Sequence, residues 1–234
     1  MRGCLFILVV GALVLGAGAW FGSPILASSV ITAALEGSGY DAASSTVTAT
    51  SNPPPKLLLG RADRVEIVGT DVSFRTFHAA SLDLILTDVD VVARTARHIS
   101  GRIDGAELAA TTANPVRADV TIDGAATAAA ATITVPGEMV DRIVKATFQT
   151  KFGVALTATE LVAPNTLRIG VRGITVEGRL GVDTAGTIVL STPLGSSTIL
   201  SLDPSFPLRF RSIAVDGADL RIDATLDAEA LLGG

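Results

Sequence analysis

The sequence contains few of the residues on which metal sites, disulfides and common enzyme mechanisms depend. Cysteine occurs once and histidine twice among 234 residues. One cysteine excludes an intramolecular disulfide framework and any cysteine-cluster metal site. His78 and His98 belong to no H-E-x-x-H or H-x-H pattern, so we predict no metal. Aromatic residues make up only 4% of the chain, and its apolar content of 48% is therefore mainly aliphatic.

Charge and nucleotide-binding motifs are also scarce. Charged residues make up 18% of the chain and the formal net charge is -5. An acidic chain lacks the basic face that displaces phosphate counterions, so we expect no nucleic-acid partner. The sequence has no Walker A loop, no G-x-G-x-x-G opening a helix and no G-x-S-x-G elbow. We therefore predict no cofactor and no catalysis, because an enzyme would have to rely on Asp, Glu, Lys or Ser alone.

Residues 1–22 have the composition of a targeting segment. Arg2 precedes an uninterrupted apolar stretch from Leu5 to Phe21. A positive start followed by an apolar core is typical of a secretory signal, and Ala17-Gly18-Ala19 has the small-x-small form of a cleavage site. An uncleaved membrane anchor is the alternative, because the stretch approaches the roughly 20 residues that span a bilayer. Both interpretations predict that the remainder is exported.

Residues 23–234 are expected to form a single domain with a proline-rich break at residues 53–55. A short apolar helix is predicted after Ser23-Pro24, ending at Gly37. Apolar and polar residues then alternate over 116–123, 174–180 and 219–227. This period of two predicts antiparallel strands with one buried face and one wet face.

Two further patterns refine the expected sheet and its cover. Between residues 82 and 92 the leucines share one parity and the valines the other, which predicts a sheet-bending β-bulge near Thr87-Asp88. Residues 136–152 have the period of an amphipathic helix. Its apolar face comprises Met139, Val140, Ile143, Val144, Thr147 and Phe148. This face is expected to pack on the sheet as core, and in a sharper interpretation sheet and helix enclose a lipid-sized cavity. Both can hold, because a cavity wall has the same composition as core.

A family resemblance adds a function to this pattern. The segment from Leu58 to Ile67, LLGRADRVEI, resembles an L-x-G-R-x-D-x-V-x-[VI]-like segment of the LmeA family of bacterial cell-envelope proteins. The order that follows is also similar: a leucine strand at 82–86, a helix after Pro136, paired strands and a closing DGADLRI at 216–222. The resemblance covers about residues 24–228.

The resemblance implies a β-dominated α+β fold, with a long curved antiparallel sheet wrapped on one or two helices, akin to tubular lipid-binding domains. It implies non-catalytic binding, and possible transport, of a phospholipid or related acyl lipid in the periplasm or cell envelope, with the N-terminal segment as the contact with the membrane. In one form of this arrangement, the protein is tethered to the outer face of the inner membrane. The rival hypothesis is a structural or interaction module of the envelope, with a filled apolar core and no ligand.

Candidate site residues follow from these expectations. Arg61 and Arg64 are candidates for contact with a lipid headgroup. The candidate apolar lining comprises Leu82, Leu84, Leu86, Met139, Val140, Ile143, Val144, Phe148, Leu220 and Ile222.

Overall fold

The computed structural model describes residues 25, 27–33, 35–37, 39–74, 77–108, 116–193, 195–202 and 207–233. The predicted signal peptide or anchor at residues 1–22 lies outside the described residues. Residues 25, 27–33 and 35–37 are helical, as the sequence predicts. No helix among the described residues is long and apolar enough to span a membrane.

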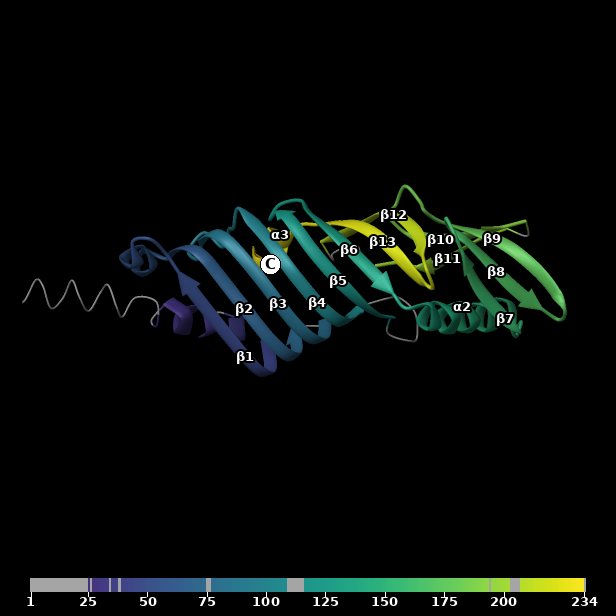
Figure 1. Cartoon of the computed structure of the whole chain (residues 1–234), viewed down its shortest axis with the longest axis horizontal. Helices are drawn as coiled ribbons and strands as arrows, with labels where there is room; N and C mark the ends of the chain where they lie inside the picture. The colour runs from purple at the N-terminus through teal and green to yellow at the C-terminus, as the bar shows by residue number, and fades with distance from the viewer. Residues whose placement is uncertain are drawn as a thin grey trace, which may run out of the picture.

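An eight-stranded antiparallel sheet forms most of the molecule (Figure 1). Its strand order is β1-β2-β3-β4-β5-β6-β13-β12, so that β13 pairs with β6 and β12 forms the edge beside β13. The strands are β1 (Tyr40–Thr50), β2 (Arg61–Phe74), β3 (Phe77–Asp90), β4 (His98–Leu108), β5 (Val116–Ala125), β6 (Ala129–Val135), β12 (Leu208–Asp216) and β13 (Asp219–Leu226). This sheet confirms the prediction of a β-dominated α+β fold with antiparallel strands.

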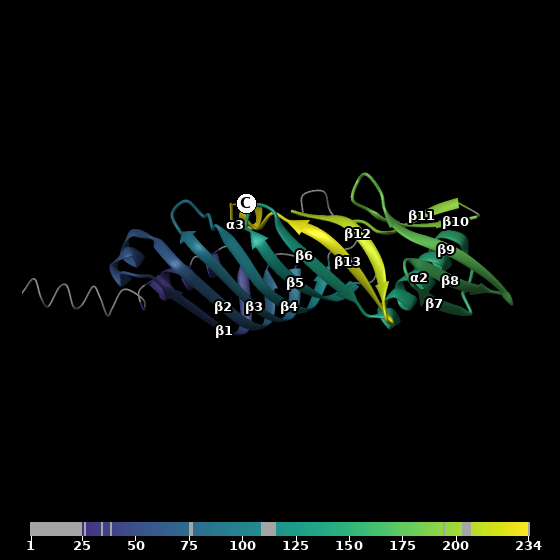
Figure 2. The same ribbon diagram turned by 45° about the horizontal axis from the view of Figure 1, so that its top comes forward.

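A second, five-stranded antiparallel sheet lies at one end of the long axis (Figures 1 and 2). Its order is β11-β10-β9-β8-β7, and the sequence patterns did not separate it from the first sheet. Its strands are β7 (Ala158–Val162), β8 (Thr166–Val171), β9 (Ile174–Val182), β10 (Ile188–Thr192) and β11 (Gly195–Leu200). Ile174 was expected to be buried with Val176 and Leu180, but it is 67% exposed because it begins β9 just after a turn.

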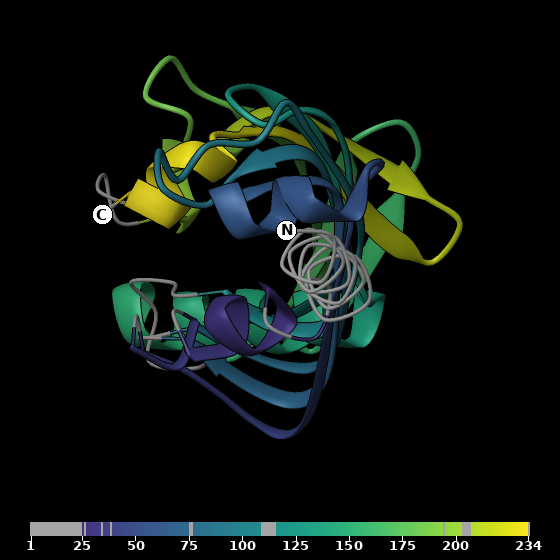
Figure 3. The same cartoon turned by 90° about the vertical axis from the view of Figure 1, so that its left-hand side faces the viewer.

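Short helices complete the described fold. The predicted amphipathic helix is α2 (Gly137–Phe152), which begins after Pro136 and ends at Gly153 in a left-handed conformation. The proline-rich break leads into a 3-10 helix, η1 (Pro54–Leu59), and α3 (Ala228–Gly233) follows β13. In the end-on view the first sheet is curved, and the helical segments lie on its concave side (Figure 3).

The strand register gives the first sheet one continuous aliphatic face, which we call the apolar face. One row of directly paired residues crosses six strands, from Gly69 through Leu82, Ile103, Val120 and Ile133 to Ile222. A second row comprises Val47, Ile67, Leu84, Gly101, Ile122, Ala131 and Ala224. A third comprises Ala49, Val65, Leu86, Ile99 and Gly124. Directly paired residues share a face, so these rows extend over the sheet.

The predicted bulge near Thr87-Asp88 is wrong, although β3 does change phase there. β3 keeps one register with both β2 and β4 along its length. Asp88 has a φ of 50°, in the left-handed region that aspartate tolerates better than most residues. The side chains of β3 therefore change the face to which they point at Asp88, and no extra residue is inserted into the strand. A register shift occurs instead in β4, between Ile103 and Ala106.

Candidate functional site

The apolar face contains strand residues that the sequence analysis proposed as lipid lining. Leu82 and Ile222 lie in the first row of the apolar face, Leu84 lies in the second row and Leu86 in the third. Leu82, Leu86 and Ile222 are buried, whereas Leu84 is half-buried. The strand residues therefore share one surface of the sheet, but they differ in how much of each is covered.

Helix α2 closes one part of the apolar face. Val140, Ile143 and Val144 are buried and line a small space together with Leu220 and Ile222. That space has a volume of about 20 Å³, which is close to the size of one water molecule. Met139 and Phe148, on the same helix, are half-buried. The packing around Val144 is therefore a filled core, and the lipid-sized cavity considered for this helix is not found there.

The other part of the apolar face is covered less completely. Val47, Ile67 and Leu84 are consecutive members of one row across β1, β2 and β3. Ile67 is buried, but Val47 and Leu84 are half-buried. We call Val47 and Leu84, with the half-buried Ile31 and Leu35 of the N-terminal helical residues, the aliphatic strip.

The N-terminal helical residues are held beside the first strand. The hydroxyl of Ser28 accepts a hydrogen bond of 3.2 Å from the backbone N–H of Ala49 in β1. Ile31 and Leu35 pack against the core, whereas Val30 is exposed. The sequence predicted this apolar helix but not its place against the sheet, so Ile31, Leu35 and Val47 were missed as candidate lining.

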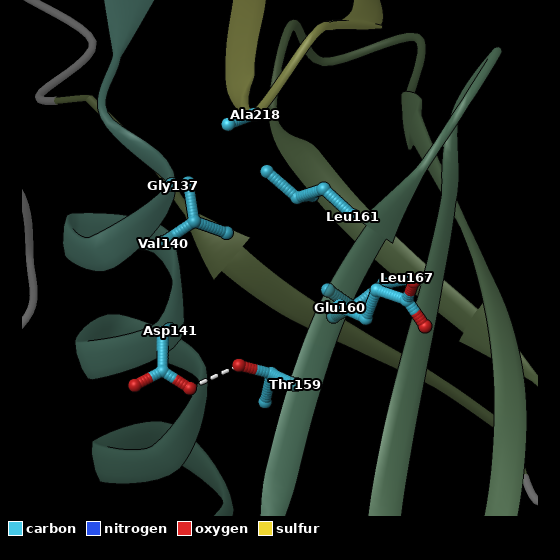
Figure 4. Close-up of a pocket in the computed structure, with 8 residues that line it drawn as sticks. All are labelled: Gly137, Val140, Asp141, Thr159, Glu160, Leu161, Leu167 and Ala218. Atoms are coloured by element: carbon cyan, nitrogen blue, oxygen red, sulfur yellow. Dashed lines mark hydrogen bonds between the residues drawn. The ribbon is translucent and has the colours of Figure 1, made fainter.

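A pocket of about 210 Å³ lies between the first turns of α2 and strand β7 (Figure 4). It is lined by Gly137, Val140, Asp141, Thr159, Glu160, Leu161, Leu167 and Ala218. Drug-sized ligands occupy pockets of roughly 300 Å³ or more. The pocket is therefore small for a lipid, and the sequence patterns singled out only Val140 from its lining.

Polar groups in this pocket are already paired. Thr159 donates a hydrogen bond to Asp141 across the pocket (Figure 4), and the Nζ of Lys145 lies 2.8 Å from the other carboxylate oxygen. Burial disfavours the ionised form of Asp141, but the hydrogen bonds from Lys145 and Thr159 outweigh it, so the pKa of Asp141 lies below its ordinary value. A carboxylate held ionised in this way stabilises the junction of α2 and β7, and it is poorly suited to general acid chemistry.

Asp141→Asn is expected to lower the stability of the protein at neutral pH by about 1 kcal/mol or less, because the pair is partly exposed. A depressed pKa in the folded state stabilises the fold above the unfolded-state pKa near 3.8, and this contribution is lost as the pH falls through the folded-state pKa. The difference in melting temperature between the two proteins should therefore shrink below about pH 4. A difference that stays constant down to pH 2 would contradict this role for the carboxylate.

The two candidate headgroup residues lie at exposed positions near acidic partners. Arg61 approaches Asp90 at 3.7 Å, and Arg64 approaches Glu66 at 3.4 Å. Each arginine precedes a buried residue of β2, Ala62 after Arg61 and Val65 after Arg64. Their side chains are thus available at the surface, and their contact with a headgroup stays a prediction.

Among the described residues, no group of three or more His, Cys, Asp or Glu side chains could hold a metal ion. His98 instead lies 3.5 Å from the exposed carboxylate of Asp123. The features of the described residues that bear on lipid binding are the apolar face and its aliphatic strip.

Comparison with known proteins is consistent with these features. No curated protein and no solved structure gives a significant match to the chain. A family model described as LmeA-like phospholipid-binding matches residues 18–225, which confirms the resemblance seen in the sequence. The chain therefore belongs to the LmeA-like phospholipid-binding family.

Proposed function

We propose that the protein binds a phospholipid or a related acyl lipid without catalysis, and that the acyl chains lie along the aliphatic strip. The observation that carries the proposal is the partial cover of the apolar face at Leu84 and Val47, in a row whose other side chains, Ile67, Ile122, Ala131 and Ala224, are buried. An added apolar group can bury more exposed aliphatic surface at this half-buried row than at the closed core around Val144, so binding is more favourable at the row.

The composition of the strip suits an acyl chain. Burying one methylene contributes about 0.8 kcal/mol, so a chain of about sixteen carbons gains on the order of 10 kcal/mol before the entropic cost of binding. The lining proposed here is aliphatic, with few of the aromatic faces on which sugars stack. Arg61 and Arg64 are the proposed headgroup contacts, since both guanidinium groups are at the surface near one end of the sheet.

The cellular setting follows from the family and the leader. Family membership supports a role in the cell envelope, and the apolar segment at residues 5–21 would export the chain or anchor it in the membrane. The curved sheet with helices on its concave side supports a likeness to tubular lipid-binding domains (Figure 3). Transport between membranes would be a further step beyond binding.

Native mass spectrometry tests the binding. The full chain is exported from a bacterial host with its own leader and purified without detergent. We expect adducts that organic extraction identifies as phospholipid, and the protein mass also reports whether the leader is cleaved. If the purified protein carries no adduct, it is incubated with phosphatidylethanolamine and phosphatidylglycerol vesicles. Failure to take up lipid from them would refute the proposal.

A structural module of the envelope is the second candidate, and two volumes favour it. The space around α2 is about 20 Å³ and the pocket beside β7 is about 210 Å³. Neither would hold a complete phospholipid, so this hypothesis treats the apolar face as core alone. It predicts a protein that stays free of lipid after exposure to vesicles.

A further inference from the structure

Three large aliphatic side chains are exposed together at one end of the molecule. Leu58 and Leu59 of η1 are 51% and 73% exposed, and Val92, in the turn between β3 and β4, is 82% exposed. The two segments are in contact, because a Cβ on Gly60 would lie 2.9 Å from the side chain of Val92. We call Leu58, Leu59 and Val92 the apolar tip. None of the three side chains is used by the proposed lipid-binding strip.

The tip is built on a well-defined backbone. Leu57 of η1 is buried, and the N–H of Val91 donates a hydrogen bond of 2.8 Å to the carbonyl oxygen of Gly60. The turn that carries Val92 is closed by reciprocal backbone hydrogen bonds between Asp90 and Thr95. The three aliphatic side chains are thus presented to solvent by a fixed support, so their docking would require little ordering of the backbone.

Basic side chains surround the tip although the chain as a whole is acidic. Lys56 lies in η1, Arg61 begins β2 just after it, and Arg94 and Arg97 follow Val92. Lys56, Arg61 and Arg97 each lie within 4 Å of a carboxylate. Arg94 forms no ion pair with any residue in the part of the chain that the structure describes. Cations beside exposed aliphatic side chains are the combination that binds anionic lipid surfaces.

The apolar tip lies near the N-terminal helical residues, and this position favours a membrane as its partner. η1 and the N-terminal helical residues lie at the same end of the long axis (Figures 1 and 3). The apolar sequence at residues 5–21 precedes Ile25, which is itself exposed. A leader that engages the bilayer would therefore bring this end of the domain to the lipid surface. At the opposite end, Ile174, which begins β9 just after the turn from β8, is an exposed aliphatic side chain.

From these observations we infer that the apolar tip is a membrane-docking surface. Leu58, Leu59 and Val92 insert into the interfacial region of a phospholipid bilayer, and Arg94 contacts the anionic headgroups. Docking at this end would let the long axis of the domain point away from the bilayer instead of lying flat on it, and it would place Arg61 near the bilayer surface. The inference does not depend on whether the aliphatic strip holds a lipid, because the two surfaces share no residue.

Site-specific depth measurement tests the docking in the full chain. Cys4→Ser removes the native thiol, and Leu59→Cys or Val92→Cys then carries the polarity-sensitive fluorophore NBD. The labelled proteins are reconstituted with vesicles of phosphatidylethanolamine and phosphatidylglycerol. We expect the NBD emission at both positions to shift to the blue and to be quenched by lipids bearing a doxyl group close to the headgroup.

Ile174→Cys provides the matched control, because residue 174 is also highly exposed but lies at the other end of the molecule. Its NBD label should keep the emission of a water-exposed probe and escape quenching. The inference is overturned if the labels at 59 and 92 behave like the label at 174, whether or not the protein is bound to the vesicles. It is also overturned if all three labels are quenched equally, since that would indicate a domain lying flat on the bilayer.

Discussion

Gly101→Ala is expected to destabilise the protein by about 3 kcal/mol or more, or to prevent folding. Gly101 lies in β4 between Leu84 and Ile122 in the second row of the apolar face. A Cβ there would lie 2.1 Å from the carbonyl oxygen of Asp83 and 2.9 Å from the Cα of Leu84, and the φ of 151° disfavours a side chain. Backbone atoms cannot rotate out of the way as a side chain can. For a chain of this size the loss corresponds to a fall of roughly 10 °C in melting temperature.

Gly181→Ala is the matched control for that measurement. Gly181 also lies in a strand, β9, but a Cβ there would meet nothing within 4 Å. We expect its melting temperature to be unchanged or slightly higher, because alanine reduces the entropy of the unfolded chain. If Gly101→Ala has the same melting temperature as Gly181→Ala and the unchanged protein, β3 and β4 do not approach each other as closely at this position as the structure indicates.

The sequence predicted the elements whose two faces differ most. Strands β5 and β13 were identified because buried Val120 or Ile222 alternates with exposed or half-buried polar residues. Helix α2 was identified because its apolar residues recur with the helical period and Pro136 marks its start. In these segments burial on one side alone determines the pattern, so local periodicity is sufficient.

The features that the sequence did not predict depend on contacts between distant residues. Leu220 pairs with Val135 across a long stretch of chain, and no local pattern specifies that partner. Strands β7 and β10 are only five residues long, which is too short for a clear period. Asp88 changes the facing of β3 through its φ alone, and a single aspartate in a strand does not reveal this beforehand.

The same limit applies to the candidate site. Val144 and Leu84 are both aliphatic residues on apolar faces, and the sequence placed them in one lining. In the structure Val144 is fully buried by the packing around α2, whereas Leu84 is half-buried. The difference depends on which element covers each residue. Substitutions at these two positions can therefore separate a lipid-binding surface from structural core.

Leu84→Asp is expected to reduce phospholipid adducts in native mass spectrometry by about tenfold or more, while the protein stays folded. A carboxylate beside an acyl chain would lose its hydration without gaining a partner, which is costly. In the lipid-free protein the half-buried position leaves the carboxylate access to water. Leu84→Met, which keeps the apolar character and approximate volume, should retain the adducts.

Val144→Ala should give the opposite result. Val144 is fully buried, so the loss of two methyl groups is expected to destabilise the protein by about 2 kcal/mol and to leave the adducts in place. Melting temperature and adduct intensity, measured on the same preparations, separate the two effects. If folded Leu84→Asp keeps its lipid while folded Val144→Ala loses it, the ligand lies beneath α2 rather than along the aliphatic strip. If both folded variants keep their lipid, acyl chains bind at neither position, and the apolar face serves the sheet as core.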